Sequence, residues 1–255
     1  MSGVLAEILA TKAREITLLR AQHFPAAPAL RPVPLRRTAG EPLRLIAEIK
    51  RRSPSAGALS TSLGVGERAA AYARAGATMV SVLCDTRYFD GRFEHLTEAR
   101  ASCALPLLCK EFVIDEVQLD AARAYGADAV LLIVRCLAPA RVEALISAAR
   151  ERELEPFVEV ATDEEVRVAL DAGATLVGVN ARDLDTLVMD GARAARIIEG
   201  LPPSIVSAHL SGLGTAEAVA KVARGPTHAA LIGETLMRQD DAEPLLRRLV
   251  EAAKG

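Results

Sequence analysis

A short glycine-centred segment recurs along the chain at intervals of about 50 residues. Its copies are Ala75-Gly76-Ala77-Thr78, Tyr125-Gly126-Ala127-Asp128, Ala172-Gly173-Ala174-Thr175 and the looser Arg224-Gly225-Pro226-Thr227. Each copy follows a segment with helical spacing of apolar residues and precedes a run rich in β-branched residues. A helix that turns into a strand commonly needs a left-handed residue at its end, which glycine adopts without strain. The repeat therefore predicts a chain of alternating helices and strands.

Eight short apolar runs supply the strands of this repeat. They are residues 44–50, 78–84, 106–110, 128–133, 155–160, 176–180, 204–207 and 228–232. Residues 129–134 are apolar throughout, as in parallel strands that are covered on both faces. Each glycine interval holds two strand–helix units, so four such intervals around a closed barrel would give eight. An open doubly wound sheet also has such turns, but eight units in about 210 residues favour a closed (β/α)8 TIM barrel.

The first 42 residues lie outside the repeat. Apolar residues at helical spacing predict an amphipathic helix over residues 4–22, and four prolines between residues 25 and 34 predict an extended connector. We therefore expect a single barrel domain over residues 1–255, in which residues 1–42 form a helical extension and a proline-rich connector. The helix either covers the bottom or side of the barrel or helps to close the mouth of the active site.

Composition excludes several classes of protein. The 31 Lys and Arg nearly balance the 33 Asp and Glu, which gives no support to nucleic-acid binding driven by charge, and 51% hydrophobic residues argue against disorder. Cys84, Cys103, Cys109 and Cys136 form no CxxC pair, so we expect free thiols in a reducing compartment. We expect no signal peptide, because charged residues interrupt the apolar stretches of the first helix, and no membrane span, because no apolar run is long enough for a bilayer. These features predict a cytoplasmic protein without nucleic-acid or membrane partners.

Charged residues stand at the predicted end of the first strand, where barrel enzymes place their chemistry. Glu48 and Lys50 are two positions apart, so both should point into the barrel as an ion pair, either structural or functional. Lys110 ends the third strand. It is either a surface lysine or a proton donor, and repulsion from Lys50 together with desolvation should lower the pKa of Lys110.

Further polar residues end the fifth and sixth strands. Glu159 stands in Val158-Glu159-Val160, and Asn180 and Arg182 stand in Gly178-Val179-Asn180-Ala181-Arg182. With the two lysines and Glu48 they form an acid–base set, without a nucleophilic Ser/His or Cys/His pair and without a cluster of metal ligands. The sequence therefore predicts proton-transfer chemistry that needs no metal.

Two glycine-containing loops follow the last two strands. They read Ser211-Gly212-Leu213-Gly214-Thr215 and Ile232-Gly233-Glu234-Thr235, at the place where many barrels bind phosphate through backbone N–H groups. The alternative is that these glycines serve only the turns. Ser53, from the first loop, is a candidate hydroxyl donor to the same phosphate.

These motifs together resemble indole-3-glycerol-phosphate synthase, a family of tryptophan biosynthesis. The matching segments are Ile46-Ala47-Glu48-Ile49-Lys50-Arg51-Arg52-Ser53-Pro54-Ser55, Phe89-Asp90-Gly91, Leu108-Cys109-Lys110-Glu111-Phe112-Val113-Ile114-Asp115, Gly126-Ala127-Asp128-Ala129-Val130-Leu131-Leu132-Ile133, Val158-Glu159-Val160, Gly178-Val179-Asn180-Ala181-Arg182-Asp183-Leu184 and Gly233-Glu234. The resemblance covers essentially the whole chain, including the helix that this family adds before its barrel.

The resemblance implies a carboxy-lyase without cofactor or metal that acts on a small phosphorylated substrate. It would close 1-(2-carboxyphenylamino)-1-deoxyribulose 5-phosphate to indole-3-glycerol phosphate, with loss of CO2 and water. Lys110 would be the general acid of ring closure, and Glu159 the acid–base partner of the dehydration. Lys50 would hold the substrate carboxylate, Glu48 would position Lys50 and bind substrate, and Asn180 would orient the reacting groups.

The resemblance also implies which residues bind substrate. Arg182 would help Asn180 to orient the reacting groups. Around the phosphate it places Ser53, Ser211, Gly212, Gly233 and Glu234, and around the anthranilate ring it places Phe89, Phe112 and Leu131. The protein would act as a monomer or a weak homo-oligomer.

One departure from the family concerns the seventh strand. Where the family usually reads Glu-Ser-Gly-Ile, the chain reads Leu210-Ser211-Gly212-Leu213, so leucine replaces a carboxylate. Neighbouring His209 should face the opposite side of the strand. Ala56 also stands where many members have a basic residue. These changes raise the alternatives of a diverged paralogue with weak or altered activity and of a barrel that binds a phosphorylated ligand without turnover. A third alternative, a phosphoribosylanthranilate isomerase, would need cysteine and aspartate at strand ends, where the first strand has Glu48 and Lys50.

Overall fold

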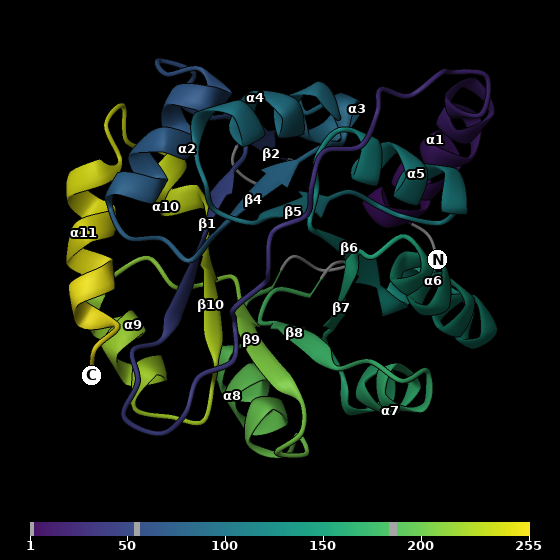
Figure 1. Ribbon diagram of the computed structural model, residues 1–255. Helices are drawn as coiled ribbons and strands as arrows, with labels where there is room; N and C mark the ends of the chain where they lie inside the picture. Colours follow the sequence, from purple (N-terminus) through teal and green to yellow (C-terminus); the bar gives the residue numbers. More distant parts are fainter. Residues whose placement is uncertain (1–2, 54–56, 184–187) are drawn as a thin grey trace.

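Eight parallel strands close into a barrel in the computed structural model, which describes residues 3–53, 57–183 and 188–255 (Figure 1). Around the barrel the strands are β1 (Arg44–Ile49), β4 (Met79–Leu83), β5 (Leu107–Lys110), β6 (Ala129–Ile133), β7 (Glu155–Val160), β8 (Leu176–Asn180), β9 (Val206–Leu210) and β10 (Ala229–Ile232), with β10 paired to β1. The predicted (β/α)8 TIM barrel is confirmed.

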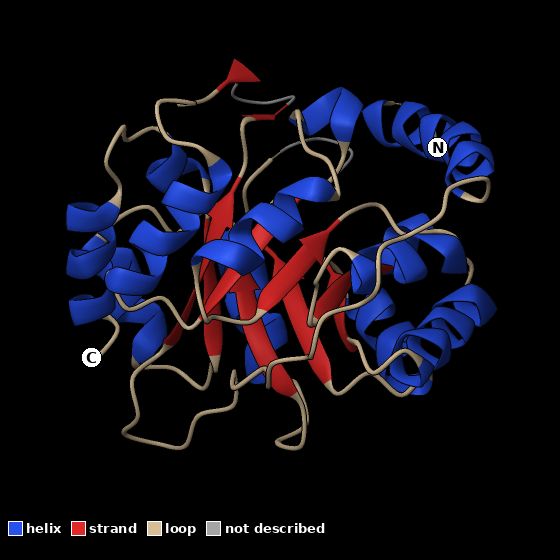
Figure 2. Ribbon diagram, turned by 45° about the horizontal axis from the view of Figure 1, so that its top comes forward, coloured by secondary structure: helices blue, strands red, loops and turns tan. Residues whose placement is uncertain are grey.

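Helices surround the barrel on its outside (Figure 2). The longer ones are α2 (Val65–Arg74), α4 (Glu94–Ser102), α5 (Glu116–Ala124), α6 (Pro139–Glu151), α7 (Asp163–Asp171), α8 (Gly191–Glu199), α9 (Ala216–Ala223) and α11 (Glu243–Ala252). Shorter elements lie near the strand ends: α3 (Thr86–Phe89), α10 (Glu234–Met237), the 3-10 turn η1 (Val134–Cys136) and the small hairpin of β2 (Arg52–Ser53) and β3 (Gly57–Ala58). Thr162 and Thr215 begin α7 and α9, because each hydroxyl accepts a backbone N–H bond of the first turn. In the part of the chain that the structure describes, no helix is long and apolar enough to cross a membrane.

The glycine turns mostly have the conformation that the repeat predicts. Gly76, Gly126 and Gly173 follow α2, α5 and α7 with φ of 94°, 102° and 80°. Gly225, the looser fourth copy, is not left-handed, so the prediction is wrong there. The connection from α9 to β10 turns with an ordinary backbone instead.

Alternate residues of each strand separate the barrel interior from the layer under the helices. In β1, Ile46 packs inside with residues of the other strands, whereas Leu45, Ala47 and Ile49 pack in the outer layer. The interior positions include Met79, Leu108, Ala129, Leu131, Phe157, Leu176, Ala208, Leu210, Ala229 and Leu231. This alternation places Glu48 on the inner side, at the carboxyl end of the barrel.

Strand β9 lies later in the sequence than predicted. The expected strand was 204–207, but β9 runs from Val206 to Leu210 and pairs with β8 up to Asn180. The run of apolar residues is interrupted there by Ser207 and His209, which point outward. Ser207 has its polar partner outside the barrel, since its hydroxyl lies 3.1 Å from a ring nitrogen of His228. Polar residues on the outer face therefore hid this strand.

The first helix, α1 (Val4–Leu19), lies beside the mouth of the barrel and packs on α5. It ends one turn before the predicted residue 22, because Ala21 and Gln22 close a tighter turn with hydrogen bonds to Leu18 and Leu19. Leu5 and Ile8 of α1 belong to the same buried cluster as Phe112. The helix therefore lies at the side of the barrel and near the active-site mouth, and it is not the part of the chain that covers the bottom.

The proline-rich connector covers the bottom of the barrel. Leu35 is 1% exposed and joins the apolar cluster of the barrel interior. The backbone N–H of Arg31 donates to Asp128 at 2.6 Å. The side chain of Arg37 donates to the carbonyls of Ala223, the last residue of α9, and of Gly225, at 2.8 and 2.7 Å. Arginine side chains thereby bind carbonyl groups that a helix end leaves without partners.

Candidate active site

Two adjoining cavities open at the carboxyl ends of the strands. The first, which we call the aromatic cavity, has a volume of about 140 Å³, and the second, the glycine-loop cavity, of about 290 Å³. Every site residue that the sequence predicts lines one or both of them. Both cavities contain Glu48, Lys50, Lys110, Arg182 and Ser211; the aromatic cavity adds Ser53, Phe89, Phe112, Leu131, Glu159 and Asn180, and the glycine-loop cavity adds Gly212, Gly233 and Glu234.

Glu48 lies between two ammonium groups where the cavities meet. Its Oε1 is 2.9 Å from Nζ of Lys50, and its Oε2 is 2.9 Å from Nζ of Lys110. The Glu48 side chain is 3% exposed. Burial by itself raises the pKa of this carboxyl, but the charges of Lys110 and Lys50 outweigh burial and lower it to about 2. Glu48 is therefore an ionised carboxylate that keeps both lysines at the mouth.

Lys110 is more basic than the sequence predicted. Burial lowers its pKa, but the negative charges of Glu48 and Glu159 outweigh burial, so the pKa is raised above 10.5. The prediction of a lowered pKa is wrong, because it counted the repulsion by Lys50 and not the carboxylate that lies between the two ammonium groups. Lys110 therefore carries a proton at neutral pH, as a general acid must.

Glu159 is held by a short chain of hydrogen bonds. Nδ2 of Asn180 donates to Oε1 of Glu159 at 2.8 Å, and Oδ1 of Asn180 accepts bonds from the hydroxyl of Ser211 at 2.8 Å and from the backbone N–H of Arg182 at 2.9 Å. Burial raises the pKa of Glu159, and it exceeds the lowering by Lys110 and Asn180. A carboxyl with a raised pKa holds its proton to higher pH, which suits an acid.

The wall of the aromatic cavity is apolar. The rings of Phe89 and Phe112 lie 6.0 Å apart, tilted by 37°. Leu131 lines the same cavity, together with Leu83 and Ile133, which the sequence reasoning did not select. Both occupy interior-facing positions at strand ends, so the alternation that found Glu48 was also the signal for them.

The glycine-loop cavity has a backbone shape that only a few residues tolerate. Ser211 and Gly212 both have positive φ, 71° and 78°. Gly233 lies so close to Glu48 that an added Cβ would be 2.4 Å from Oε1. Thr235, from the predicted loop after the last strand, also lines this cavity, and so does Arg238, which was not predicted. The spacing of four between Glu234, which begins α10, and Arg238, which follows it, was the available signal for their ion pair at 2.8 Å.

Ser53 lies apart from the other expected phosphate ligands. It is 5% exposed and lines the aromatic cavity, not the glycine-loop cavity. The phosphate role of Ser53 accordingly has less geometric support than the roles of Ser211 and Gly212.

Leu210 fills the barrel interior below the mouth. It is 1% exposed, and its Cδ1 packs so tightly on Gly178 that a Cβ there would lie 2.7 Å away. His209 points the other way, as predicted, and lines a cavity between α8 and α9. Leu210 therefore supplies no carboxylate to the mouth, and the carboxylate that contacts both Lys50 and Lys110 is that of Glu48. Ala56 lies outside the described residues.

Residues 3–53, 57–183 and 188–255 contain no group of three or more His, Cys, Asp or Glu residues that could hold a metal ion. The polar groups that line the mouth are ammonium, guanidinium, carboxyl, hydroxyl and amide groups. Such a set can hold an anionic substrate and move protons.

Comparisons with known proteins agree on one family. The family model of indole-3-glycerol phosphate synthase matches residues 6–249. The indole-3-glycerol phosphate synthase of Exiguobacterium sp. is 39% identical over 245 residues, which are 96% of this chain and 95% of the relative. Indole-3-glycerol phosphate synthase 2 of Streptomyces coelicolor is 46% identical over 82% of this chain and 81% of its own length, and the enzyme of Mycobacterium tuberculosis is 40% identical over 99% and 92%.

Solved structures of other proteins share the fold. Thiamine phosphate pyrophosphorylase from Pyrococcus furiosus superimposes with a TM-score of 0.63 at 18% identity, covering 83% of this chain and 95% of its own. KGPDC from Streptococcus mutans superimposes with a TM-score of 0.62 at 13% identity, covering 84% of this chain and 98% of its own. At such identities the likeness concerns the barrel alone. The relatives and the family model disfavour the isomerase and the non-catalytic alternatives, and the chain belongs to the indole-3-glycerol phosphate synthase family.

Proposed function

We propose that this chain closes 1-(2-carboxyphenylamino)-1-deoxyribulose 5-phosphate to indole-3-glycerol phosphate, with release of CO2 and water. One observation carries the assignment of roles: Glu48 holds Lys50 and Lys110 at the junction of an apolar cavity and a glycine-rich one. The substrate has the same division, since it carries an aromatic acid at one end and a phosphate at the other.

The phosphate occupies the glycine-loop cavity in this proposal. Arg182 and Arg238 line it and supply positive charge, and the backbone around Ser211, Gly212 and Gly233 supplies N–H groups. The anthranilate ring lies against Phe89, Phe112 and Leu131 in the aromatic cavity. The ketose carbonyl then lies between the two, next to Lys110.

Lys110 acts in ring closure. The ring carbon that bears the carboxylate attacks the ketose carbonyl carbon, and Nζ of Lys110 donates its proton to the carbonyl oxygen. The new carbon–carbon bond closes the five-membered ring, and the carboxylate then leaves as CO2 while its bonding electrons restore the aromatic ring. The raised pKa of Lys110 keeps it protonated for this step. Lys50 binds the carboxylate before it leaves, and Glu48 holds both lysines in place.

Glu159 acts in the dehydration that follows. The hydroxyl on the former carbonyl carbon takes a proton from the Glu159 carboxyl and leaves as water. The Glu159 carboxylate that remains then takes a proton from the neighbouring CH2 carbon, which forms the double bond of the indole ring and restores the Glu159 carboxyl. Asn180 holds Glu159 in position through its hydrogen bond of 2.8 Å, and Arg182 orients the reacting groups beside it.

The test is a progress curve with the authentic substrate, followed by the indole absorbance and fluorescence. The chain contains no tryptophan, so product fluorescence has little protein background. We expect wild-type turnover that is linear in enzyme concentration. Absence of product from a protein whose circular dichroism shows the folded barrel would refute the proposal.

The setting of the reaction belongs to the same proposal. The chain acts in the cytoplasm on a free small molecule, as a monomer or weak homo-oligomer, without a cofactor and without nucleic acid. Size-exclusion chromatography with light scattering over a hundredfold range of protein concentration tests the oligomeric state.

A further inference from the structure

We infer that Lys12, on α1, is a positioning residue that sets the spacing of the two phenylalanines of the aromatic cavity. Its ammonium group holds two buried carboxylates, and each of these carboxylates fixes the backbone of one phenylalanine. The inference rests on the proposed function only where it predicts steady-state kinetics.

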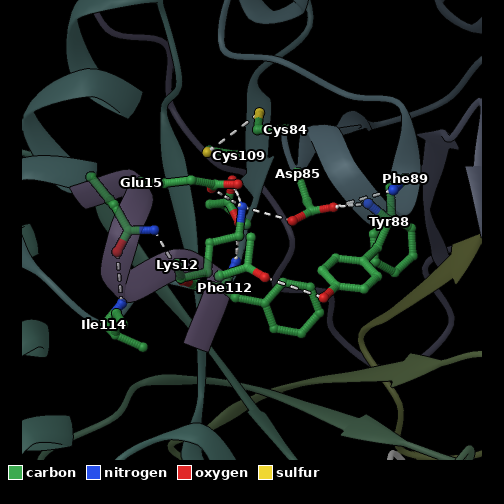
Figure 3. A network of polar contacts seen from close by, with 12 residues as sticks. Lys12, Glu15, Cys84, Asp85, Tyr88, Phe89, Cys109, Phe112 and Ile114 are labelled. Carbon is green, nitrogen blue, oxygen red and sulfur yellow. Dashed lines mark hydrogen bonds and ion pairs between the residues drawn. The ribbon is translucent and has the colours of Figure 1, made fainter. Parts of the chain in front are cut away.

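Lys12 is buried although it belongs to a helix at the outer edge of the fold. It is 1% exposed, and its Nζ lies 2.7 Å from Oδ2 of Asp85, 3.0 Å from Oε1 of Glu111 and 2.8 Å from Oε2 of Glu15 (Figure 3). Asp85 is fully buried and the Glu111 side chain is 3% exposed, whereas the Glu15 side chain is 40% exposed. Lys12 therefore joins α1 to the ends of β4 and β5.

Both buried carboxylates also accept backbone hydrogen bonds next to the aromatic cavity. Oδ1 of Asp85 accepts the N–H groups of Tyr88 and Phe89, at 2.7 and 3.2 Å, and thereby caps α3. Oε1 of Glu111 accepts the N–H of Phe112 at 2.6 Å. Phe89 and Phe112 are thus tied through Asp85 and Glu111 to one nitrogen atom of α1.

Nζ of Lys12 supplies the positive charge that balances Asp85 and Glu111. Burial raises the pKa of Glu111 to about 7 in spite of Lys12, and the charge of Asp85 adds to the increase. Burial lowers the pKa of Lys12, but Glu111 and Asp85 outweigh it, so the pKa is raised above 10.5. Within the described residues, every ion pair of Asp85 and Glu111 is made with Lys12. Without it, both carboxyl groups lose the ammonium group that fixes their positions, and the pKa of Glu111 rises further, so the backbone hydrogen bonds that orient Phe89 and Phe112 are no longer held in place.

A general anchoring role of α1 is the competing explanation, and the chain offers a matched control. Arg20, at the end of α1, pairs with Asp115 of the barrel at 2.7 Å. Neither residue lines the aromatic cavity. Arg20→Met therefore removes an ion pair between α1 and the barrel without touching the carboxylates that hold the two rings.

The experiment compares Lys12→Met with Arg20→Met. We expect Lys12→Met to raise KM about tenfold and to change kcat less than about threefold, because ring binding is lost while the proton donors remain. Lys12→Arg should recover most of the loss, and Arg20→Met should leave both constants within about twofold. Inorganic phosphate, as a competitive inhibitor, should bind wild type and Lys12→Met equally well.

Ligand binding without turnover separates this inference from the proposed function. Calorimetry with 2-(methylamino)benzoate, a probe for the aromatic end alone, should show weaker binding to Lys12→Met than to wild type, even if no substrate were turned over. If Lys12→Met does not fold, the double variant Lys12→Met/Glu111→Gln carries one buried carboxylate fewer and should show the same weaker binding. Unchanged affinity for this probe, an equal loss in Arg20→Met, or an equal loss of phosphate affinity would overturn the inference.

Discussion

Replacing Glu48 by glutamine tests the electrostatic core of the site. The substitution keeps the size of the side chain but leaves Lys50 and Lys110, each 2.9 Å from it, without their shared negative charge. A pKa lowered from 4.5 to about 2 corresponds to about 3 kcal/mol in favour of the ionised form, since a factor of ten is worth about 1.4 kcal/mol. Removal of one partner of a buried pair costs about 3–5 kcal/mol. We therefore expect the free energy of unfolding of Glu48→Gln to fall by about 3 kcal/mol at pH 7.

The pH dependence of this loss has a defined sign. A carboxyl whose pKa is lowered in the folded state contributes stability above its unfolded pKa, and the contribution is lost as pH falls from about 4.5 towards 2. The difference between wild type and Glu48→Gln should thus be largest near neutral pH and should shrink below pH 4.5. Glu48 also raises the pKa of Lys110, so the alkaline limb of kcat/KM should move to lower pH in the variant.

Urea unfolding at pH 7 and pH 3, together with a pH profile of kcat/KM, measures both effects. Glu98→Gln is the control, because its ion pair with Arg92 is exposed and is expected to be worth about 0–1 kcal/mol. If Glu48→Gln lost no more stability than Glu98→Gln and kept the wild-type alkaline limb, Glu48 would not be the counter-charge of the two lysines.

Four further substitutions extend these tests. Lys110→Met should abolish indole formation while circular dichroism still shows the folded barrel; substantial residual turnover would contradict the role of Lys110 as the general acid. Glu159→Gln should lower kcat at least about a hundredfold, as expected for loss of a general acid, in a rapid-quench assay that follows release of CO2 and indole separately. Gly233→Ala should lower kcat/KM at least about tenfold, because its Cβ would lie 2.4 Å from Oε1 of Glu48, and a crystal structure of the variant should show Glu48 displaced. Asp128→Asn should destabilise the barrel by about 3 kcal/mol in urea unfolding, because Asp128 is buried and pairs with Arg100 at 2.6 Å, while kcat of the folded protein stays unchanged.

Local patterns in the sequence predicted the barrel and the mouth because the spacing of residues determines both. The spacing of the glycines gave the number of strand–helix units, and the two-residue period of a strand put Glu48 and Lys50 on one face. The two glycine-containing loops followed from their positions after the last two strands, and the aromatic wall followed from the family resemblance.

The predictions that were wrong, and the residue that was missed, depend on three-dimensional packing and not on local sequence patterns. The bounds of strand β9 were predicted wrongly because the polar side chains of Ser207 and His209 point out of the barrel, so the outer face of this strand is not apolar. The pKa shift of Lys110 had the wrong direction because it depends on which charge lies between two others, which is a property of three-dimensional packing. Lys12 was missed because its buried partners Asp85 and Glu111 are far away in the sequence and meet it only when α1 packs beside the mouth.

The first 42 residues have two separable tasks, one carried by the connector and the other by α1. The arginines of the connector bind carbonyl groups under the barrel, whereas Lys12 acts at the opposite end of the strands. A truncated protein that starts at residue 43 would therefore lose contacts at the bottom of the barrel and at the active-site mouth together. Its loss of activity could not be attributed to either change alone. A single backbone cut between His23 and Phe24 would divide the tasks, since residues 24–255 keep the underside intact. A synthetic peptide of residues 1–23 could then be added back in increasing concentration, and the activity of the enzyme would depend on how much of the helix is bound.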